Sequence, residues 1–458
     1  EDAAMTKAID ERALVLEILL EITKEHVPSH VVLYNTLAKY QYLEKRERAF
    51  ITRVTEGTLE HMIELDYIIN QFSKVKVNKM KPVIRNIIRS AVYQMKYMDS
   101  VPNSAVCNEA VKLAQKKGFG TLKGFVNGVL RNIARNLAHV AYPDQKNTIE
   151  YLSVVYSMPE WILEEWIEKL GEECTKQMLE EFQREKKVTI RCNLAKTTKE
   201  ELMKKLRSEQ VEVEEHPYLD YALIIGGFDY LGDLDAFLDG EFYVQDISSM
   251  MVAEIAAPKE GDYIIDVCAA PGGKALHLAE KLQGSGRVEA RDLTENKVFF
   301  IEENIERTNL SNITARQQDA TVYDEKSRET ADILIADLPC SGLGVIGKKP
   351  DIKYNMTKEQ QEELSRLQKT ILNTVHSYVK PGGYLVYSTC TIRESENMGN
   401  VRWFLEQFPE FESVSIDRYL PEIIRKDTKE NCMQFLPGVH KSDGFFIAKF
   451  RKKDLAES

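Results

Sequence analysis

The first third of the chain carries its apolar residues at helical spacing. This spacing runs from residue 5 to about residue 137, as in Ala13, Leu16, Ile18, Leu19, Ile22 and again in Phe50, Val54, Leu59, Ile63. A run of this kind gives each helix one apolar face. Glycine is sparse before Gly118, and Pro82 stands where a helix can begin, ahead of a run to Met98. The pattern predicts an all-helical domain of five to seven helices.

A polar connector at residues 142–147 separates this region from a second pattern. A short amphipathic stretch with Trp161 and Trp166 comes next, and strand-like and helix-like segments then alternate. We expect a strand at 188–193, a helix at 198–208, and strands at 211–215 and 222–225. This order predicts a small α/β module of the ferredoxin or RRM-like kind.

Beyond residue 241, strands and helices alternate regularly. We expect strands at 263–267, 287–292, 313–317, 333–336 and 384–388, and helices at 275–282, 296–308 and 359–379. Such alternation is typical of a doubly wound, Rossmann-like parallel sheet, which binds ligands at the carboxyl ends of its strands. We therefore divide the chain into a helical domain (1–140), a linker (141–160), a small α/β module (161–240) and a Rossmann-like domain (241–452).

The charge of the chain is unevenly distributed. The net charge is −11, yet residues 71–140 hold thirteen basic side chains against two acids. Because nucleic-acid binding depends on local potential, this stretch is a candidate phosphate-binding surface. Charge alone equally fits the solvated face of a helical domain. The candidate RNA contacts are Lys74, Lys76, Lys79, Lys81, Arg85 and Arg89, with Arg191 added from the small module.

Several protein classes are disfavoured by the same sequence. No segment approaches the roughly 18 consecutive apolar residues of a membrane span, and the N-terminus lacks a basic-then-apolar signal segment. The seven cysteines are widely spaced without a Cys-x-x-Cys pair, which favours thiols in a reducing compartment. His26 and His30 lie four positions apart without a third ligand, so we expect no metal. We expect a soluble, cytoplasmic protein.

A small-residue turn follows the first strand of the Rossmann-like domain. It consists of Cys268, Ala269, Ala270, Pro271, Gly272, Gly273 and Lys274. A Walker A loop is excluded because Cys268 stands at the position of its first glycine and Ala275 follows the lysine. A dinucleotide loop is excluded because G-x-G-x-x-G is absent. The remaining motif is the cofactor turn of S-adenosylmethionine methyltransferases, in which the ligand lies against a helix N-terminus.

Three acids end successive strands of this domain. Asp292 follows the glycine turn by about 20 residues, where an acid can accept hydrogen bonds from both ribose hydroxyls. Asp319 ends the next strand and suits the adenine amino group, and Asp337 ends the strand after that. A single acid of this kind is more often a turn or cap residue. Together with the glycine turn, the three predict an S-adenosylmethionine site.

Two cysteines also stand at strand ends. Cys340 lies in the sequence DLPCSG and Cys390 in YSTC, and adjacent strands would bring them together. A methyltransferase that acts on an unreactive ring carbon must first activate the ring by adding a thiolate, so cysteines here favour covalent chemistry. Most cysteines are inert packing residues, and this interpretation is kept for Cys107, Cys174, Cys192, Cys432 and, with more caution, Cys268.

These motifs resemble known families. The segment at 88–135 resembles the NusB-like RNA-binding fold, and DVCAAPGGK, DLPCSG, YSTC, FYVQDISS and the C-terminal FLPGVHKSDGFFIAKFRK are similar to the Sun/Fmu family of RNA 5-methylcytosine methyltransferases. Over its whole length the chain resembles the RsmB branch of this family, which acts on bacterial 16S ribosomal RNA. The one mild departure is Leu338, where alanine is commoner.

The resemblance implies a role for each site residue. It implies that Cys390 attacks the cytosine, that Cys340 assists product release, and that Asp337 holds the N3/N4 edge of the base with Lys274 nearby. To donate to N3, Asp337 would have to carry a proton in the closed site. A DNA enzyme would instead attack with Cys340.

The resemblance also implies a substrate, and alternatives remain beside it. We expect a monomer acting on naked or partly assembled 16S ribosomal RNA, with the target cytosine flipped out of its stack. Action on tRNA or another RNA remains an alternative. So does a non-catalytic RNA-binding assembly factor, which loss of motif residues would have indicated.

Overall fold

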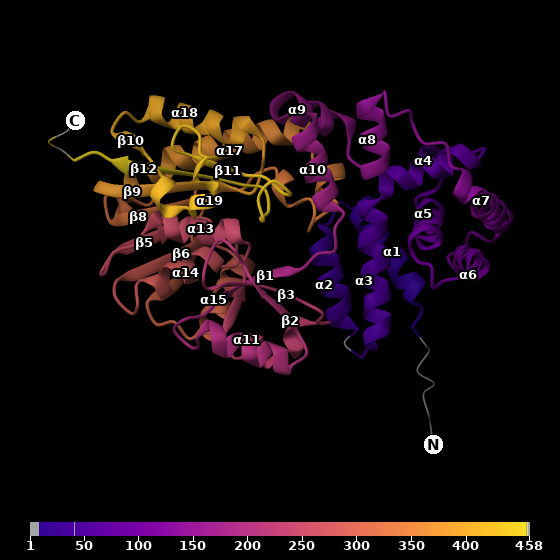
Figure 1. Ribbon diagram of the computed structural model, residues 1–458, viewed down its shortest axis with the longest axis horizontal. Coiled ribbons are helices and arrows are strands. Elements are labelled where there is room, and N and C mark those ends of the chain that lie inside the picture. Colours follow the sequence, from indigo (N-terminus) through magenta and orange to yellow (C-terminus); the bar gives the residue numbers. More distant parts are fainter. Residues whose placement is uncertain (1–8, 41, 455, 457–458) are drawn as a thin grey trace, which may run out of the picture. The chain divides into compact units, whose positions relative to one another are not determined.

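A computed structural model describes residues 9–40, 42–454 and 456. The chain divides into two compact units (Figure 1). The first comprises residues 1–183 together with 346–355, and the second comprises residues 184–345 and 356–458. None of the helices in the described part is long and apolar enough to cross a membrane.

The first unit is helical throughout its described residues. Its α-helices are α1 (Glu11–Thr23), α2 (Ser29–Lys39), α3 (Lys45–Glu60), α4 (Met62–Phe72), α5 (Pro82–Tyr97), α6 (Asn103–Lys116), α7 (Lys123–Asn136), α8 (Thr148–Tyr156), α9 (Glu160–Leu170), α10 (Glu172–Phe182) and α16 (Ile352–Asn355). Seven of them lie in the region predicted to be helical, which confirms an all-α N-terminal part. Pro82 is the first residue of α5, as expected from its fixed backbone angle. Leu19, Ile51 and Ile88 are completely buried where α1, α3 and α5 pack.

A segment from the second half of the sequence completes this unit. Asp351 is buried, and its carboxylate accepts hydrogen bonds from the backbone N–H (3.2 Å) and the hydroxyl of Ser29 at the start of α2. Lys353 Nζ donates to the carbonyl of Glu60 (2.9 Å), and the Tyr354 hydroxyl donates to that of Leu59 (2.6 Å), both at the end of α3. An acid thus caps one helix N-terminus and a base caps one C-terminus, where the helix dipoles favour each charge.

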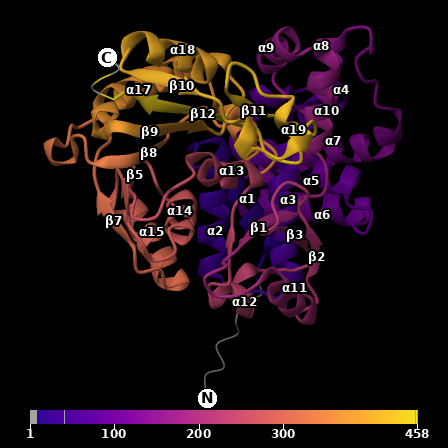
Figure 2. The same cartoon turned by 60° about the vertical axis from the view of Figure 1, so that its left-hand side comes forward.

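The small module contains a four-stranded antiparallel sheet with the strand order β2-β3-β1-β4. Its elements are β1 (Val188–Cys192), α11 (Lys199–Ser208), β2 (Glu212–Glu215), β3 (Ala222–Gly226), α12 (Asp235–Leu238) and β4 (Phe242–Val244). Figure 2 shows β1, β2 and β3 grouped with α11. Strand β4 lies beyond residue 240, in the segment assigned from the sequence to the Rossmann-like domain, yet it pairs with β1.

The larger sheet belongs to the same unit. Its elements are α13 (Ile247–Ala256), β5 (Tyr263–Asp266), α14 (Gly273–Lys281), β6 (Arg287–Asp292), α15 (Glu295–Thr308), β7 (Ile313–Gln317), β8 (Ala331–Asp337), α17 (Lys358–Val375), β9 (Val379–Thr389), α18 (Met398–Gln407), β10 (Phe411–Val414), α19 (Glu422–Arg425), β11 (Met433–Phe435) and β12 (Phe445–Lys452). The strand order is β10-β12-β9-β8-β5-β6-β7, with β11 paired to β12.

The sheet is mixed, which corrects the expectation of a wholly parallel one. Strands β5 to β9 are parallel, whereas β12 runs antiparallel to β9, and β10 runs antiparallel to β12. The expected helix at 359–379 is also too long, because α17 ends at Val375 and β9 begins at Val379. Strand β5 pairs with β6 on one side and β8 on the other, so the strand order reverses at β5. Ligands bind at such a switch point in doubly wound sheets.

Two apolar layers sandwich the sheet. Neighbouring residues of β5 point into opposite layers: Ile264 packs with α13 and α14, and Ile265 packs with α17. Figure 1 shows α14 and α15 on one side of the sheet and α17 and α18 on the other. Because both faces are covered, chemistry is left to the strand ends, where the predicted motifs lie.

Candidate active site

The turn after β5 is shaped by a glycine and fastened to the neighbouring strand. Gly272 has a φ of +111°, a conformation that a residue with a side chain rarely adopts, and it precedes the first turn of α14. The backbone N–H of Ala269 donates to the carbonyl of Arg291 (2.8 Å), and that of Ala270 donates to Asp292 Oδ2 (2.8 Å). The turn is therefore fastened to the end of β6.

Asp292 retains capacity for further hydrogen bonds. Its Oδ2 accepts from Ala270, and its Oδ1 accepts from the backbone N–H of Leu293 at 2.7 Å. A carboxylate offers about four acceptor positions, so two remain for a pair of hydroxyl groups. Asp319 lies at the next strand end, where Oδ1 accepts from the backbone and hydroxyl of Thr321 (2.8 and 2.6 Å) and these bonds lower its pKa. The ribose role of Asp292 and the adenine role of Asp319 stay predictions.

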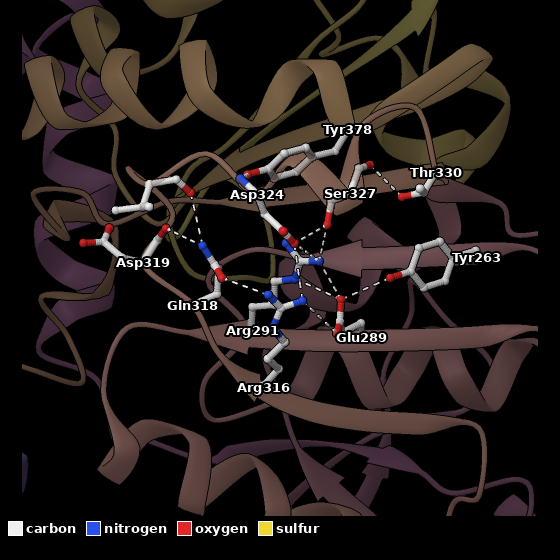
Figure 3. Close-up of polar contacts among 11 residues, drawn as sticks. Tyr263, Glu289, Arg291, Arg316, Gln318, Asp319, Asp324, Ser327, Thr330 and Tyr378 are labelled. Carbon is white, nitrogen blue, oxygen red and sulfur yellow. Dashed lines mark hydrogen bonds and ion pairs between the residues drawn. The ribbon is translucent and has the colours of Figure 1, made fainter.

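A buried arginine network supports the Asp319 loop (Figure 3). Arg291 is 1% exposed and donates to Glu289 Oε2 (2.6 Å) and the Ser327 hydroxyl (2.6 Å). Asp324 lies 3.4 Å from Arg291 and 3.3 Å from Arg316. Although burial alone would raise the pKa of Glu289, its hydrogen bond with Arg291 and the nearby guanidinium charges lower it. The network joins β6 and β7 to the segment after Asp319 and holds that segment in place.

Asp266, which the sequence analysis did not single out, ends β5 at the centre of the site. It is 1% exposed, and its carboxylate lies near the Lys274 ammonium and the backbone N–H of Cys268. Burial, with the Asp337 carboxylate as second cause, raises its pKa to about 8. A buried acid at a switch point with unused acceptor positions is suited to a polar or cationic ligand group. Its signal in the sequence was the one used for Asp292, an acid ending an apolar strand.

The two strand-end cysteines meet, as expected. The Sγ atoms of Cys340, after β8, and Cys390, after β9, lie 3.1 Å apart. The hydrogen bond with Cys390, followed by burial, raises the pKa of Cys340 well above its usual range. Cys340 is therefore held as a protonated thiol, which can donate in this sulfur–sulfur contact.

Lys274 and Asp337 form an ion pair beside these sulfurs. Lys274 Nζ lies 2.7 Å from Asp337 Oδ2, while the Ser388 hydroxyl donates to Asp337 Oδ1 at 2.8 Å. Burial alone would lower the pKa of Lys274, but Asp337, Asp266 and Cys390 together raise it. With one oxygen facing the Lys274 ammonium and the other accepting from Ser388, Asp337 is placed as an acceptor, unlike the donor to N3 that was expected. The pairing with Lys274, on a helix that begins 64 residues earlier, was not visible in the local sequence.

The other five cysteines have the environment of packing residues. Burial raises the pKa of Cys192 and Cys432 to about 12, and it raises that of Cys107, Cys174 and Cys268 as well. Their sulfurs are therefore poor candidates for a nucleophile. In the described residues, no group of three or more His, Cys, Asp and Glu side chains is arranged to hold a metal ion.

Comparison with known proteins places this site in a family. Three family models match: "16S rRNA methyltransferase RsmB/F" over residues 253–451, "NusB family" over 10–135, and "Methyltr_RsmF/B-like, ferredoxin-like domain" over 158–228. The probable ribosomal RNA small subunit methyltransferase B of Bacillus subtilis is 35% identical, and the match covers 96% of this chain and 98% of that protein. The chain belongs to the RsmB family of ribosomal RNA small subunit methyltransferases.

Solved structures agree with the RsmB assignment. The crystal structure of PH0851 matches 97% of this chain and 100% of that one, with a TM-score of 0.81 and 26% identity. NSun6 from Pyrococcus horikoshii, solved with the S-adenosylmethionine analogue SFG, matches 63% of this chain and 97% of its own, with a TM-score of 0.55 and 25% identity. The cofactor of this RsmB family member is S-adenosylmethionine, for which Asp292, Asp319 and Asp266 supply fitting polar groups.

The predicted RNA contacts divide into two groups. Lys74, Lys76, Lys79 and Lys81 are all exposed around the start of α5. Arg85 is half-buried, and its guanidinium donates to the backbone carbonyls of Val77 (2.9 Å) and Met80 (3.0 Å). The four lysines therefore remain candidates for phosphate contacts, whereas Arg85 mainly fixes the loop that carries them.

Two predicted arginine contacts are wrong for this RsmB chain. Arg89 is buried and makes two hydrogen bonds of 2.7 Å to the carboxylate of Asp66. Arg191 is 2% exposed, donates to Gln245 Oε1 (2.9 Å) and pairs with Glu280. Because these guanidinium groups are enclosed and neutralised, they serve packing and not RNA recognition.

Proposed function

We propose that this protein transfers a methyl group from S-adenosylmethionine to carbon 5 of a cytosine in 16S ribosomal RNA, through a covalent cysteine adduct at carbon 6. The observation that carries the proposal is the 3.1 Å contact between the Cys340 and Cys390 sulfurs beside the Lys274–Asp337 ion pair. An amine or hydroxyl methylation needs no thiol, whereas carbon 5 becomes nucleophilic only after a thiolate has added to the ring. The bound cofactor supplies an electrophilic methyl group.

Cys390 is the proposed nucleophile. Cys390 is one of the groups whose charge raises the pKa of Lys274. The Lys274 ammonium therefore favours a negative charge on the Cys390 sulfur. Attack forms the bond from Sγ to carbon 6 and makes carbon 5 enamine-like. A thiolate beside a lysine is the ordinary route to a reactive cysteine near neutral pH.

Cys340 is the proposed release residue. After methylation, carbon 5 loses its proton to water, the carbon 5–carbon 6 double bond reforms, and the bond from carbon 6 to Cys390 breaks. The electron pair of that bond returns to the Cys390 sulfur, which must be stabilised as it leaves. Cys340, protonated and 3.1 Å away, donates a hydrogen bond to the departing sulfur. This division of labour is the RNA-type order of attack; a DNA-type order would exchange the two roles.

Asp337 and Lys274 are proposed to hold the polar edge of the base. Asp337 can accept from the cytosine amino group, and the Lys274 ammonium, 2.7 Å from Asp337, can donate toward N3. A stacked, paired cytosine cannot present carbon 6 to a thiolate, so the target must be flipped out or single-stranded. The exposed lysines at 74, 76, 79 and 81 are proposed to hold the surrounding phosphates.

The test uses RNA that contains 5-fluorocytosine, because fluorine cannot leave as a proton does and the adduct is therefore trapped. The wild-type protein is expected to form a covalent complex, and Cys390→Ala is expected to form none. Cys340→Ala should retain attack and accumulate the adduct even on ordinary RNA. A trapped adduct in Cys390→Ala that disappears in Cys340→Ala would reverse the proposed roles.

The proposed substrate form and active species are tested separately. Naked 16S transcript or a partly assembled particle is expected to be methylated faster than the complete small subunit or tRNA. The active species is expected to sediment as a monomer at the concentrations of the assay.

A further inference from the structure

Glu396 is a completely buried acid that neither the cofactor site nor the proposed chemistry uses. It ends a short 3-10 helix, Glu394–Glu396, that follows the Cys390 loop. Its Oε1 accepts from the backbone N–H of Ser341 (2.9 Å) and from Gln368 Nε2 (3.0 Å), and its Oε2 accepts from the Ser341 hydroxyl (2.5 Å). Ser341 directly follows Cys340, so Glu396 is hydrogen-bonded to the residue next to one of the two site cysteines.

The same contact extends to the other cysteine loop. The hydroxyls of Ser341 and Thr391 lie 2.7 Å apart, and Thr391 directly follows Cys390. A serine hydroxyl has one hydrogen, which Ser341 gives to Glu396, so Thr391 must be the donor in the pair. The bonds run in one direction, from Thr391 to Ser341 to Glu396. They connect the residues that immediately follow the two cysteines.

Glu396 is itself held rigidly. Its backbone carbonyl accepts from the Tyr387 hydroxyl and from Asn400 Nδ2 (3.1 Å). Gln368 Nε2 also donates to the carbonyl of Pro339 (2.8 Å), and Asn400 Nδ2 donates to Gln368 Oε1 (2.9 Å). Tyr387, Gln368 and Asn400 are buried. A buried network in which these donors find acceptors leaves the carboxylate little freedom to move.

We propose that Glu396 is a positioning residue that holds Cys340 against Cys390 through Ser341 and Thr391. The inference rests on the proposed function, because it assigns Glu396 to the release step of that reaction. Attack on the base needs the Cys390 sulfur alone, whereas release needs the Cys340 thiol within hydrogen-bonding reach. The Glu396 carboxylate bonds the Cys340 loop directly and reaches Thr391 of the Cys390 loop through the Ser341 hydroxyl. Its loss should therefore damage release more than attack.

The experiment compares Glu396→Ala with Glu394→Ala, a change to an exposed acid in the same 3-10 helix. Trapping on 5-fluorocytosine RNA measures attack, and the adduct level on ordinary RNA measures release. Glu396→Ala is expected to trap at nearly the wild-type rate, accumulate the adduct on ordinary RNA, and turn over about 100-fold more slowly. Glu394→Ala should match the wild type in all three measurements.

Smaller changes keep the test decisive if Glu396→Ala does not fold. Ser341→Ala and Thr391→Val each remove one hydroxyl from the chain of bonds and should show the same accumulation of adduct. Thr391→Ser restores a donor at that position and should restore release. A merely structural role would lower attack and release together and would not be rescued in this way.

A double variant shows whether Glu396 acts through Cys340. Glu396→Ala combined with Cys340→Ala should release product no more slowly than Cys340→Ala alone. The inference is overturned if the losses of release rate in the two single variants multiply in the double variant. It is also overturned if Glu396→Ala and Ser341→Ala each slow attack and release equally. The proposed function is judged separately by wild-type trapping and its loss in Cys390→Ala, so the two failures can be told apart.

Discussion

The ammonium of Lys274 lies 2.7 Å from a carboxylate oxygen of Asp337, with 16% and 23% of the two side chains exposed. Removing one partner of such a pair destabilises the fold, because the other partner is left as a poorly hydrated, unpaired charge. Removing both partners leaves no such charge. The pair also stands next to the Cys390 sulfur, whose negative charge Lys274 favours. Stability and reactivity can therefore be separated at this position.

Lys274→Met is expected to lower the free energy of unfolding by about 2–3 kcal/mol, less than for a fully enclosed pair because both groups still contact solvent. Adding Asp337→Asn should recover most of that loss in urea titrations. The rate of trapping on 5-fluorocytosine RNA should fall about 100-fold in both variants. In both variants the trapping rate should rise as the pH is raised from about 7 to about 9, because higher pH restores the thiolate. An unchanged trapping rate would contradict the role of Lys274.

The exposed lysines at the start of α5 predict a salt-dependent contribution to RNA binding. Lys79→Gln should reduce the slope of log affinity against log salt by roughly 0.7–0.9, the value for one lost phosphate contact. Lys39→Gln, at an exposed position of α2, is the matched control and should leave the slope unchanged. Binding of 16S transcript over a range of salt concentrations measures both. Equal slopes in the two variants would show that this lysine surface does not contribute to RNA binding.

Asp266 predicts a pH dependence of stability. Its pKa is about 8 in the folded protein and near 3.8 ordinarily, so the folded state binds more protons between these values. Its contribution to stability is complete below about pH 4 and is lost as pH rises through the folded pKa. Asp266→Asn should flatten this decline, which is at most about 1.4 kcal/mol per pH unit for one group. Urea unfolding without cofactor measures it, with the exposed Asp417→Asn as control. A slope that Asp266→Asn leaves unaltered would contradict the prediction.

Asp351 predicts a local effect on α2. Asp351→Ala removes the acceptor for the Ser29 N–H and should destabilise the start of that helix by about 1–2 kcal/mol. Hydrogen exchange at the first amides of α2 should accelerate accordingly. Asp351→Asn retains an acceptor oxygen and should show a smaller change. Equal exchange in the alanine variant and the wild type would show that the cap contributes nothing.

Patterns along the sequence predicted the features that are determined by residues close together in the chain. Strand ends and the glycine turn located Asp292, Asp319 and both cysteines, because each lies at or just after the end of a predicted strand. The antiparallel edge of the sheet was not predicted, since nothing local to β12 shows which way it runs beside β9.

Features that depend on distant partners were missed or misjudged. Arg191 looked like a phosphate contact, but its partner Glu280 lies 89 residues further on and encloses it. The proposed role of Glu396 depends on Ser341, 55 positions earlier. Charge and residue type alone do not distinguish an enclosed arginine from an exposed one. Tertiary contacts decide it.

The helical unit is not one continuous stretch of chain, because residues 346–355 complete it. A protein synthesised from its N-terminus would expose the start of α2 and the end of α3 without their caps until Asp351, Lys353 and Tyr354 had emerged from the ribosome. By then β5 to β8 would already have been made. The caps of α2 and α3 are therefore added only after half of the strands of the larger sheet have been synthesised, and no single cut of the chain yields both units intact.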